Sequence, residues 1–300
     1  MPISASEVRA VVASEDDFGH EMRVGGVIRS IQGLRWEHGG TYMDPVTGKP
    51  RQFDYRCWLT KTVKCKPPSL EAYTLSLAAE CKSLSQSAAL VVCGTSRREN
   101  EATHDLVQSG KVFVEQGSTK PDWSSETWRV SGEDALYPPG AFVGKSLIRL
   151  KSVEKKDRKN IVETLEATSE SDVYDKWSQA VSSAVDLARS ACAYARDTAK
   201  GAALTAIVPA VVVPEDRLWQ VVYDDNGSLS GDPALVSECS LYVGREIDLD
   251  SSDSVQPLRL SHVHFFTLGG FSKFLSRTGS NQTEWANLFK GGRLLLPSPR

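Results

Sequence analysis

The stretch Arg51-Gln-Phe-Asp-Tyr-Arg-Cys-Trp-Leu-Thr-Lys-Thr-Val63 has the two-residue period of a β-strand. The apolar side chains of Phe53, Tyr55 and Cys57 share one face, and Asp54 lies on the opposite face. A strand of this kind buries one side against a core and leaves the other side for polar groups. We therefore predict a strand over residues 51–63 with Asp54 on its polar face.

A second predicted strand adds two more charged residues. It runs from about Tyr73 to Lys82, and Glu80 and Lys82 share a face because they are two residues apart. If the two strands pair as a hairpin, Asp54 and Glu80 come within reach of one cation. Two carboxylates, together with phosphate oxygens and water, are usual ligands of Mg²⁺. A neighbouring lysine can orient a water molecule or stabilise charge on a phosphate, so the set suits hydrolysis of a phosphodiester.

A further acid, Glu21, lies on a helix that we predict over residues 14–33. On a helical wheel Glu21 falls between Phe18, Met22 and Ile28, in the apolar stripe that we expect to face the sheet. A glutamate is almost never fully buried without a partner. A helix beside the two strands would let Glu21 join a metal site directly or through water. The alternative is a partly exposed helix residue.

These residues resemble a known family. The run Asp44-Pro-Val-Thr-Gly-Lys-Pro-Arg-Gln-Phe-Asp54, followed 26 residues later by Glu80-Cys-Lys82, is similar to the PD-(D/E)xK, restriction-endonuclease-like nuclease superfamily. It resembles in particular bacterial members that read DP-x-TGK-x-RE-x-D and then ECK. The similarity touches residues 15–95 and 172–225. Phe53 replaces the proline of the superfamily name, and Gln52 stands where the subgroup usually has glutamate.

The resemblance implies a function and a set of site residues. Asp54 and Glu80 would be metal ligands, with the main-chain carbonyl of Cys81 as a third. Lys82 would be the catalytic lysine, and Glu21 an auxiliary acid that reaches the metal directly or through water. The cofactor would be Mg²⁺ or Mn²⁺ and the substrate a nucleic acid, above all DNA, in defence or repair. A homodimer would suit double-strand cutting, which often needs two sites.

The rest of the chain mixes helices and strands, which predicts an α/β or α+β class. The resemblance implies an α/β fold with a restriction-endonuclease-like core, in which helices flank a mixed central sheet. We expect a single domain over residues 1–300, with residues 97–171 as a large insertion that contains local strands and a short helix near 160–168. A hairpin is expected from strands 204–213 and 218–223. The other expected elements are strands at 88–94, 240–243 and 262–268, a long helix at 172–200, and helices at 269–277 and 284–289.

Composition limits the class of protein. The 300 residues are 40% hydrophobic and 24% charged, which is ordinary for a globular protein. The net charge is −3, so contact with nucleic acid has to use a local basic patch. The apolar stretch Ala202–Val213 is broken by Pro209 and is too short to cross a bilayer. Six cysteines without a CxxC pair and no secretory signal lead us to expect a cytoplasmic protein without membrane contact.

Other motifs have ordinary alternatives. His262 and His264 share the face of a predicted strand, but without a third ligand nearby, surface or hydrogen-bonded histidines are the simpler interpretation. The basic stretch over residues 149–159 could follow a phosphate backbone or form a solvated charged face. Arg97 and Arg98 follow the third strand and would lie nearer the predicted site.

Simple interpretations of the main residues are also open. Glu80 and Lys82 could form a surface ion pair on an edge strand, and Asp54 could be a solvated acid near a turn. Nucleophilic catalysis has little support, because Cys93 has no paired base and Ser272 has no GxSxG frame. Two functions follow from the sequence. One is a metal-dependent nuclease, and the other is a nuclease-derived module that binds nucleic acid or protein without cutting.

Overall fold

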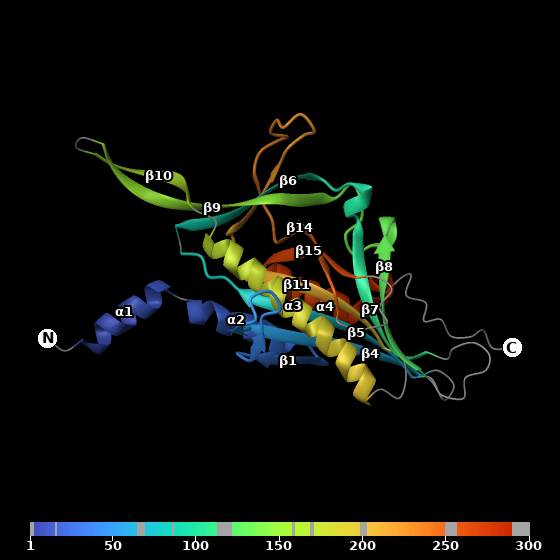
Figure 1. Cartoon of the computed structure of the whole chain (residues 1–300). Coiled ribbons are helices and arrows are strands. Elements are labelled where there is room, and N and C mark those ends of the chain that lie inside the picture. Colours follow the sequence, from blue (N-terminus) through green and yellow to red (C-terminus); the bar gives the residue numbers. More distant parts are fainter. Residues whose placement is uncertain are drawn as a thin grey trace.

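The computed structural model of the protein describes residues 3–15, 17–64, 70–85, 87–112, 122–157, 160–168, 171–198, 203–249 and 257–289. Its main feature is a mixed sheet in which thirteen strands of these residues take part (Figure 1). The expected α/β class is confirmed. Ten strands follow one path, in the order β1 (Leu34–His38), β4 (Tyr55–Lys64), β5 (Leu70–Cys81), β11 (Ala203–Val213), β15 (Leu258–Thr267), β14 (Glu238–Ile247), β9 (Phe142–Asp157), β6 (Ala88–Ser96), β12 (Leu218–Val222) and β13 (Ala234–Leu235).

The middle of the sheet is parallel. β11 pairs in parallel with β5 and with β15, and it is buried from Leu204 to Val213. A strand with parallel neighbours on both sides is covered on both faces, which explains its nearly continuous apolar sequence. The predicted hairpin between β11 and β12 is therefore wrong. β12 pairs in parallel with β6, which lies in the other half of the sheet.

β4 and β5 form the hairpin that the alternating sequences predict. They are antiparallel and in register from Tyr55 opposite Ala79 to Lys64 opposite Leu70. The start of the first predicted strand differs from the prediction. Residues Pro50–Gln52 form a separate short strand, β3, which pairs with β2 (Thr41–Met43) outside the main sheet.

Residues 97–171 contribute strands to the main sheet. β7 (Thr103–Val112) pairs with β11 and with β8 (Asp122–Ser131), while β9 pairs with β6 and β14. The short helix predicted near residues 160–168 is wrong, because this segment is strand β10 (Asn160–Thr168), paired with β9. Its β-branched residues Ile161, Val162 and Thr164 favour a strand. β9 and β10 project from the sheet as a two-stranded ribbon (Figure 1).

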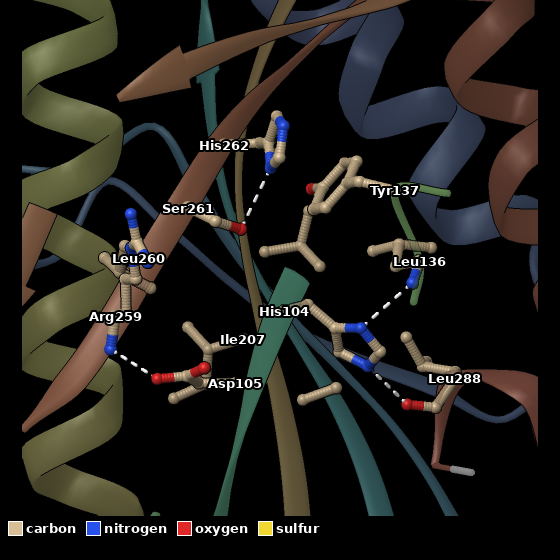
Figure 2. Close-up of a pocket in the computed structure, with 12 residues that line it drawn as sticks. His104, Asp105, Leu136, Tyr137, Ile207, Arg259, Leu260, Ser261, His262 and Leu288 are labelled. Atoms are coloured by element: carbon tan, nitrogen blue, oxygen red, sulfur yellow. Dashed lines mark hydrogen bonds between the residues drawn. The ribbon is translucent and has the colours of Figure 1, made fainter. Parts of the chain in front are cut away.

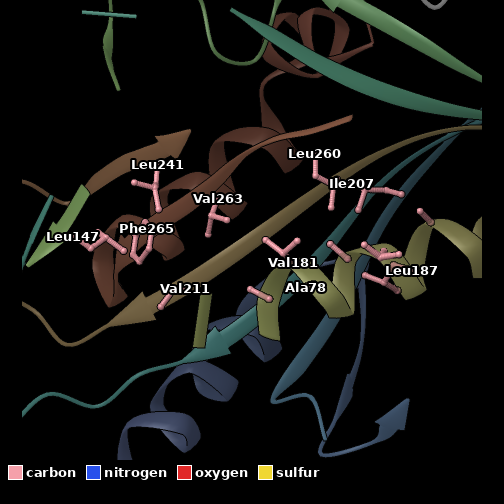
Figure 3. Packing of buried hydrophobic residues seen from close by; sticks show 14 of the residues in the cluster. Ala78, Leu147, Val181, Leu187, Ile207, Val211, Leu241, Leu260, Val263 and Phe265 are labelled. Carbon is pink, nitrogen blue, oxygen red and sulfur yellow. The ribbon is translucent and has the colours of Figure 1, made fainter. Parts of the chain in front are cut away.

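One face of the sheet is covered by α3 (Ser171–Thr198), close to the helix predicted over residues 172–200. The helix packs on β11 and β15, and its Val181 and Leu187 belong to one buried cluster with Ile207, Val211 and Phe265 (Figure 3). Small side chains let a helix approach a sheet closely, and this brings the first turns of α3 to the end of β5. The buried face of α3 consists largely of small residues: Ala180, Val181, Ala184, Val185 and Ala188.

The opposite face is covered in part by α2 (Asp17–Ser30). The helix predicted over residues 14–33 is confirmed as α2 with shorter ends, and a separate helix that sequence reasoning missed, α1 (Ala5–Glu15), precedes it. The buried side of α2 carries Val24 and Ile28, whereas Phe18 is 66% exposed. Gly25 sets this orientation, since a Cβ at that position would lie 2.3 Å from the Tyr55 hydroxyl oxygen. The helix therefore packs on the sheet with the face that carries Gly25.

Two C-terminal helices complete this face and agree closely with the prediction. α4 (Leu268–Ser280) begins after Thr267, whose hydroxyl accepts a hydrogen bond from the N–H of Gly270 at 3.1 Å. α5 (Gln282–Leu288) is capped by Asn281 in the same way. Phe271 and Phe274 of α4 are buried in the cluster that α2 joins. No helix in the described part of the chain has the length and apolar character needed to cross a membrane.

Candidate functional site

A turn between β2 and β3 sets how the chain enters β4. Oδ1 of Asp44 accepts hydrogen bonds from the N–H groups of Val46 (2.8 Å) and Thr47 (3.4 Å), and Oδ2 pairs with Nε of Arg51 at 2.6 Å. Burial raises the pKa of Asp44, but these N–H groups and Arg51 outweigh burial and lower the pKa overall. The Asp44–Arg51 segment is thus held by its own side chains. It fixes the position of Asp54 shortly after it.

The structure brings Asp54 and Glu80 together. Asp54 directly precedes β4, and because Tyr55 lies opposite Ala79, the preceding residue lies opposite Glu80. Oδ2 of Asp54 accepts a 2.7 Å hydrogen bond from the N–H of Cys81. The charge of Asp54 also acts on Glu80 and raises its pKa. The two acids are therefore neighbours on one face of the hairpin, as the alternation of the two strands predicts.

Glu80 is a fully buried carboxylate. Its exposed fraction is 0%, and neither of its carboxylate oxygens has a hydrogen-bond partner among the described residues. Burial raises the pKa of Glu80 well above its usual value, the charge of Asp54 raises it further, and Lys176 opposes both. The alternative of a surface ion pair on an edge strand is wrong, because β5 has paired strands on both sides. A buried acid without donors is costly, which is typical of a functional site.

The cation beside the two acids comes from α3. Nζ of Lys176 lies 3.0 Å from Oδ2 of Asp54 and 3.7 Å from Oε2 of Glu80. Burial lowers the pKa of Lys176, but the charges of Asp54 and Glu80 outweigh burial and raise it, so the group is an ammonium ion. Sequence reasoning missed Lys176. The signal was present, because Lys176 lies one helical turn before Ala180 on the stripe that faces the sheet.

Lys82 and Cys81 follow Glu80 along the chain. Lys82 is half-buried, and its N–H donates to the carbonyl of Val212 at 2.9 Å, which continues the pairing with β11. Among the described residues, no ion pair joins the Lys82 side chain to either acid. The thiol of Cys81 lies on the opposite face, where burial raises its pKa well above the usual value. Lys82 is thus near Glu80 in the chain but does not make the close contact that Lys176 makes.

Glu21 lies at the same end of the sheet and is paired with another residue. Its Oε1 is 2.5 Å from Nε2 of His38, and its main-chain carbonyl accepts a 3.2 Å hydrogen bond from the Tyr55 hydroxyl. Since α2 and α3 pack on opposite faces of the sheet, Glu21 approaches it from the side away from Glu80. The Glu21 side chain is 22% exposed. The structure shows no contact between Glu21 and the two acids.

Contacts from two sides fix α3 over the acids. Nη1 of Arg56 pairs with Asp186 at 2.9 Å. Nearer the site, the side-chain amide of Gln179 donates to the carbonyl of Gln52 in β3, and the Tyr42 hydroxyl donates to the carbonyl of Gln179 at 3.3 Å. The short β2–β3 pair therefore packs beside the turns of α3 that carry Lys176. The position of this lysine is set by packing and does not depend on its ion pairs alone.

Asp54 and Glu80 are the residues that could hold a divalent metal. Two carboxylates, with water and phosphate oxygens, suit Mg²⁺, and the donor-free oxygens of Glu80 fit this use. Within the described ranges there is no group of three or more His, Cys, Asp or Glu side chains that could hold a metal ion. The remaining ligands would therefore come from the main chain, water or the substrate.

A second polar cluster lies inside the protein, between β7, β15 and the end of α5 (Figure 2). Its cavity has a volume of about 10 Å³, which is room for one water molecule. Nε2 of His104 bonds to the carbonyl of Leu288 at 2.7 Å, and Nδ1 of His262 bonds to Ser261 at 2.9 Å. Burial lowers the pKa of His262 to about 2 and of His264 to about 3. His262 is buried and hydrogen-bonded, as one of the two alternatives expected, and His264 is half-buried, so a fully exposed position is wrong for both.

The predicted phosphate-binding arginines have different surroundings. Arg97 is buried, and its guanidinium donates to the hydroxyl of Ser240 at 2.7 Å and to two carbonyls, so its expected place near a phosphate is wrong. Arg98 is exposed. In the basic stretch, Lys151 is exposed on β9. Two residues of that stretch, Arg158 and Lys159, lie outside the described residues.

The geometry thus defines a compact charged site. Asp54 and Glu80 lie side by side, and the Lys176 side chain extends from α3 to both acids. Lys82 follows the last residue of β5. These residues come from three separate elements of the chain. No protein-family model matches the chain, and comparisons with curated proteins and with solved structures give no significant match.

Proposed function

We propose that the protein is a metal-dependent nuclease with a restriction-endonuclease-like core, which hydrolyses phosphodiester bonds, above all those of DNA. The observation that supports this most is the buried, donor-free carboxylate of Glu80 beside Asp54. Buried acids with such neighbours are common where a ligand completes the site. The resemblance of the runs at residues 44–54 and 80–82 to PD-(D/E)xK nucleases supports the same reading.

Each residue has a role in the proposed reaction. Asp54 and Glu80 would hold Mg²⁺ or Mn²⁺, with the main-chain carbonyl of Cys81 as a further ligand. When bound, the ion lowers the pKa of a water molecule and offsets charge on the leaving oxygen. Lys82 would orient the attacking water or stabilise charge on the phosphate. Glu21, held by His38 on the other face, would serve as an auxiliary acid.

The same proposal extends to the setting of the protein. We propose that it acts on DNA in the cytoplasm, in defence or repair. We also propose a homodimer, since cutting both strands often needs two sites. These proposals depend on the nuclease activity, and they would be wrong if the protein does not cut nucleic acid.

A cleavage assay with a matched control tests the function. Supercoiled DNA is incubated with Mg²⁺ or Mn²⁺ and with wild type, Asp54→Asn or Glu37→Gln, the last being an exposed acid on the neighbouring strand β1. We expect Asp54→Asn to lose about 100-fold or more in cleavage rate, while Glu37→Gln cuts like wild type. Equal rates in all three proteins, or no cleavage of DNA or RNA by wild type, would contradict the proposal.

A binding module without cleavage is the second candidate function. One observation favours it: the described residues supply only two acids at the site, and Lys176 already neutralises part of their charge. Calorimetric titration separates the two functions. A nuclease site should take up Mg²⁺ and lose it in Glu80→Gln, whereas a binding module should hold nucleic acid with an affinity that ignores both the metal and this substitution.

A further inference from the structure

The charge balance around Asp54 and Glu80 depends on one lysine. Nζ of Lys176 is 3.0 Å from Asp54 Oδ2 and 3.7 Å from Glu80 Oε2, so a single ammonium ion serves both carboxylates. A buried carboxylate without a hydrogen-bond donor needs a nearby cation or a proton. Among the ion pairs of the described residues, Lys176 is the only cation that Glu80 has. It therefore acts as the counter-ion of the metal-free site.

A divalent ion would compete with Lys176 for the same place. Mg²⁺ binds carboxylate oxygens at about 2.1 Å and requires near-octahedral coordination with several water molecules. The Lys176 ammonium group already contacts Oδ2 of Asp54 and approaches Oε2 of Glu80, which are oxygens that such an ion would use. Two cations held by the same oxygens also repel each other strongly at low dielectric. Both cannot keep their full contacts with the two acids.

The lysine can leave without moving the helix. The backbone of α3 is held farther along by the Arg56–Asp186 pair and by the Tyr42 hydrogen bond to Gln179. Lys176 has a flexible four-carbon stem. Its side chain is already 27% exposed, so a path to solvent exists. A change of side-chain rotamer is enough to free the carboxylate oxygens.

We propose that Lys176 is the internal cation of the metal-free site and that a divalent ion displaces its ammonium group from Asp54 and Glu80 toward solvent. The inference depends on the metal site of the proposed function. It goes further by giving Lys176 a role distinct from that of Lys82. Metal binding would uncover a positive charge at the start of α3, beside the place where a substrate phosphate would lie.

Chemical labelling of lysines tests the displacement directly. Wild-type protein is acetylated briefly with an N-hydroxysuccinimide ester, with and without saturating Mg²⁺, and each lysine is quantified by mass spectrometry. Lys145, which is paired with Glu101 away from the site, is the matched control. We expect Mg²⁺ to raise labelling of Lys176 several-fold and to leave Lys145 unchanged. In Glu80→Gln, the labelling of Lys176 should no longer respond to Mg²⁺.

The outcomes separate this inference from the nuclease proposal. If calorimetry shows that wild type binds Mg²⁺ but labelling of Lys176 stays constant or falls, the displacement is refuted and the metal site stands. If wild type binds neither Mg²⁺ nor Mn²⁺, the proposed function fails and the displacement fails with it. A second variant, Lys176→Met, should bind Mn²⁺ about tenfold more tightly than wild type. Weaker binding by this variant would also overturn the inference.

Discussion

The main-chain N–H of Cys81 donates a 2.7 Å hydrogen bond to Oδ2 of Asp54, and this bond joins the end of β5 to the start of β4. Cys81 immediately follows Glu80, so the bond also keeps the two acids side by side. Oδ2 is the same oxygen that Lys176 approaches at 3.0 Å. A single atom of Asp54 thus has a structural role and an electrostatic role, and substitutions can separate the two.

The variants Asp54→Asn and Asp54→Ala should differ in stability, and both should lose cleavage activity. The Asn side-chain oxygen can still accept the Cys81 N–H bond, whereas alanine leaves this N–H without its partner. We expect Asp54→Ala to be less stable than Asp54→Asn by about 1–2 kcal/mol in the free energy of unfolding. Urea unfolding measures this difference, and cleavage should be lost in both variants. Equal stability of the two would show that the bond contributes little.

Removing the Lys82 side chain and removing the Lys176 side chain should have different effects on cleavage and on metal binding. If Lys82 acts on the attacking water or the phosphate, Lys82→Ala should lower cleavage by about 100-fold and leave Mg²⁺ affinity unchanged. Lys176→Ala should cost about tenfold or less in rate and should tighten metal binding, because it removes a competing cation. Single-turnover cleavage combined with calorimetry distinguishes the two. If Lys176→Ala lowers the cleavage rate more than Lys82→Ala does, the catalytic ammonium group is that of Lys176 in α3.

Adjacent glycines in α2 provide a matched test of helix packing. A Cβ at Gly25 would lie 2.3 Å from the hydroxyl oxygen of the buried Tyr55, while a Cβ at Gly26 would meet nothing within 4 Å. We expect Gly25→Ala to destabilise the protein by about 1–3 kcal/mol through overpacking. Gly26→Ala should stabilise it by about 0.5–1 kcal/mol, because alanine favours a helix. Thermal or urea unfolding measures both, and equal effects would contradict the packing of α2.

Acid should destabilise the protein through its buried histidines. Burial lowers the pKa of His104. It also lowers the pKa of His262 to about 2 and the pKa of His264 to about 3, whereas a histidine in an unfolded chain has a pKa of about 6.5. Below pH 6.5 the unfolded state therefore binds more protons than the folded state, so stability falls as pH decreases toward 3. His262 and His264 should each cost about 2 kcal/mol between pH 7 and pH 5.

Urea unfolding of His264→Phe at pH 7 and pH 5 checks this sign and size. The His264 ring lies among aromatic side chains and stacks on Phe266 at 4.4 Å between ring centres, so phenylalanine suits the site. The variant should lose about 2 kcal/mol less than wild type over this interval. A loss identical to that of wild type would show that His264 does not contribute to acid sensitivity.

The hairpin that carries Asp54 and Glu80 could be predicted because its signal is local. In a strand the two-residue period alone decides which side chains share a face, so the alternation of the two strands predicts that the two acids are neighbours, whatever the remaining fold. The connection after β11 could not be predicted in this way. The sequence predicts β12 as a strand, but its parallel partner β6 lies far away in the sequence, and nothing in the turn specifies this partner.

Lys176 shows the same limit within the site. The helical wheel places it on the buried stripe of α3, but its partner Asp54 lies 122 residues earlier in the chain. Only the packing of α3 on the sheet brings these residues together. Likewise, the orientation of α2 depends on the fit of Gly25 against Tyr55, so the wheel alone placed Phe18 on the wrong side. Local periodicity identifies elements, and long-range packing decides which of their side chains meet.

Strand β10 of the projecting ribbon pairs only with β9 among the described strands, so its outer edge presents unpaired main-chain groups. Such an edge can recruit strands from other molecules and start aggregation. Glu163 and Glu166 lie along this strand, and a second copy added edge to edge would bring acidic side chains close together. The two acids would therefore oppose edge-to-edge pairing of two copies through this strand.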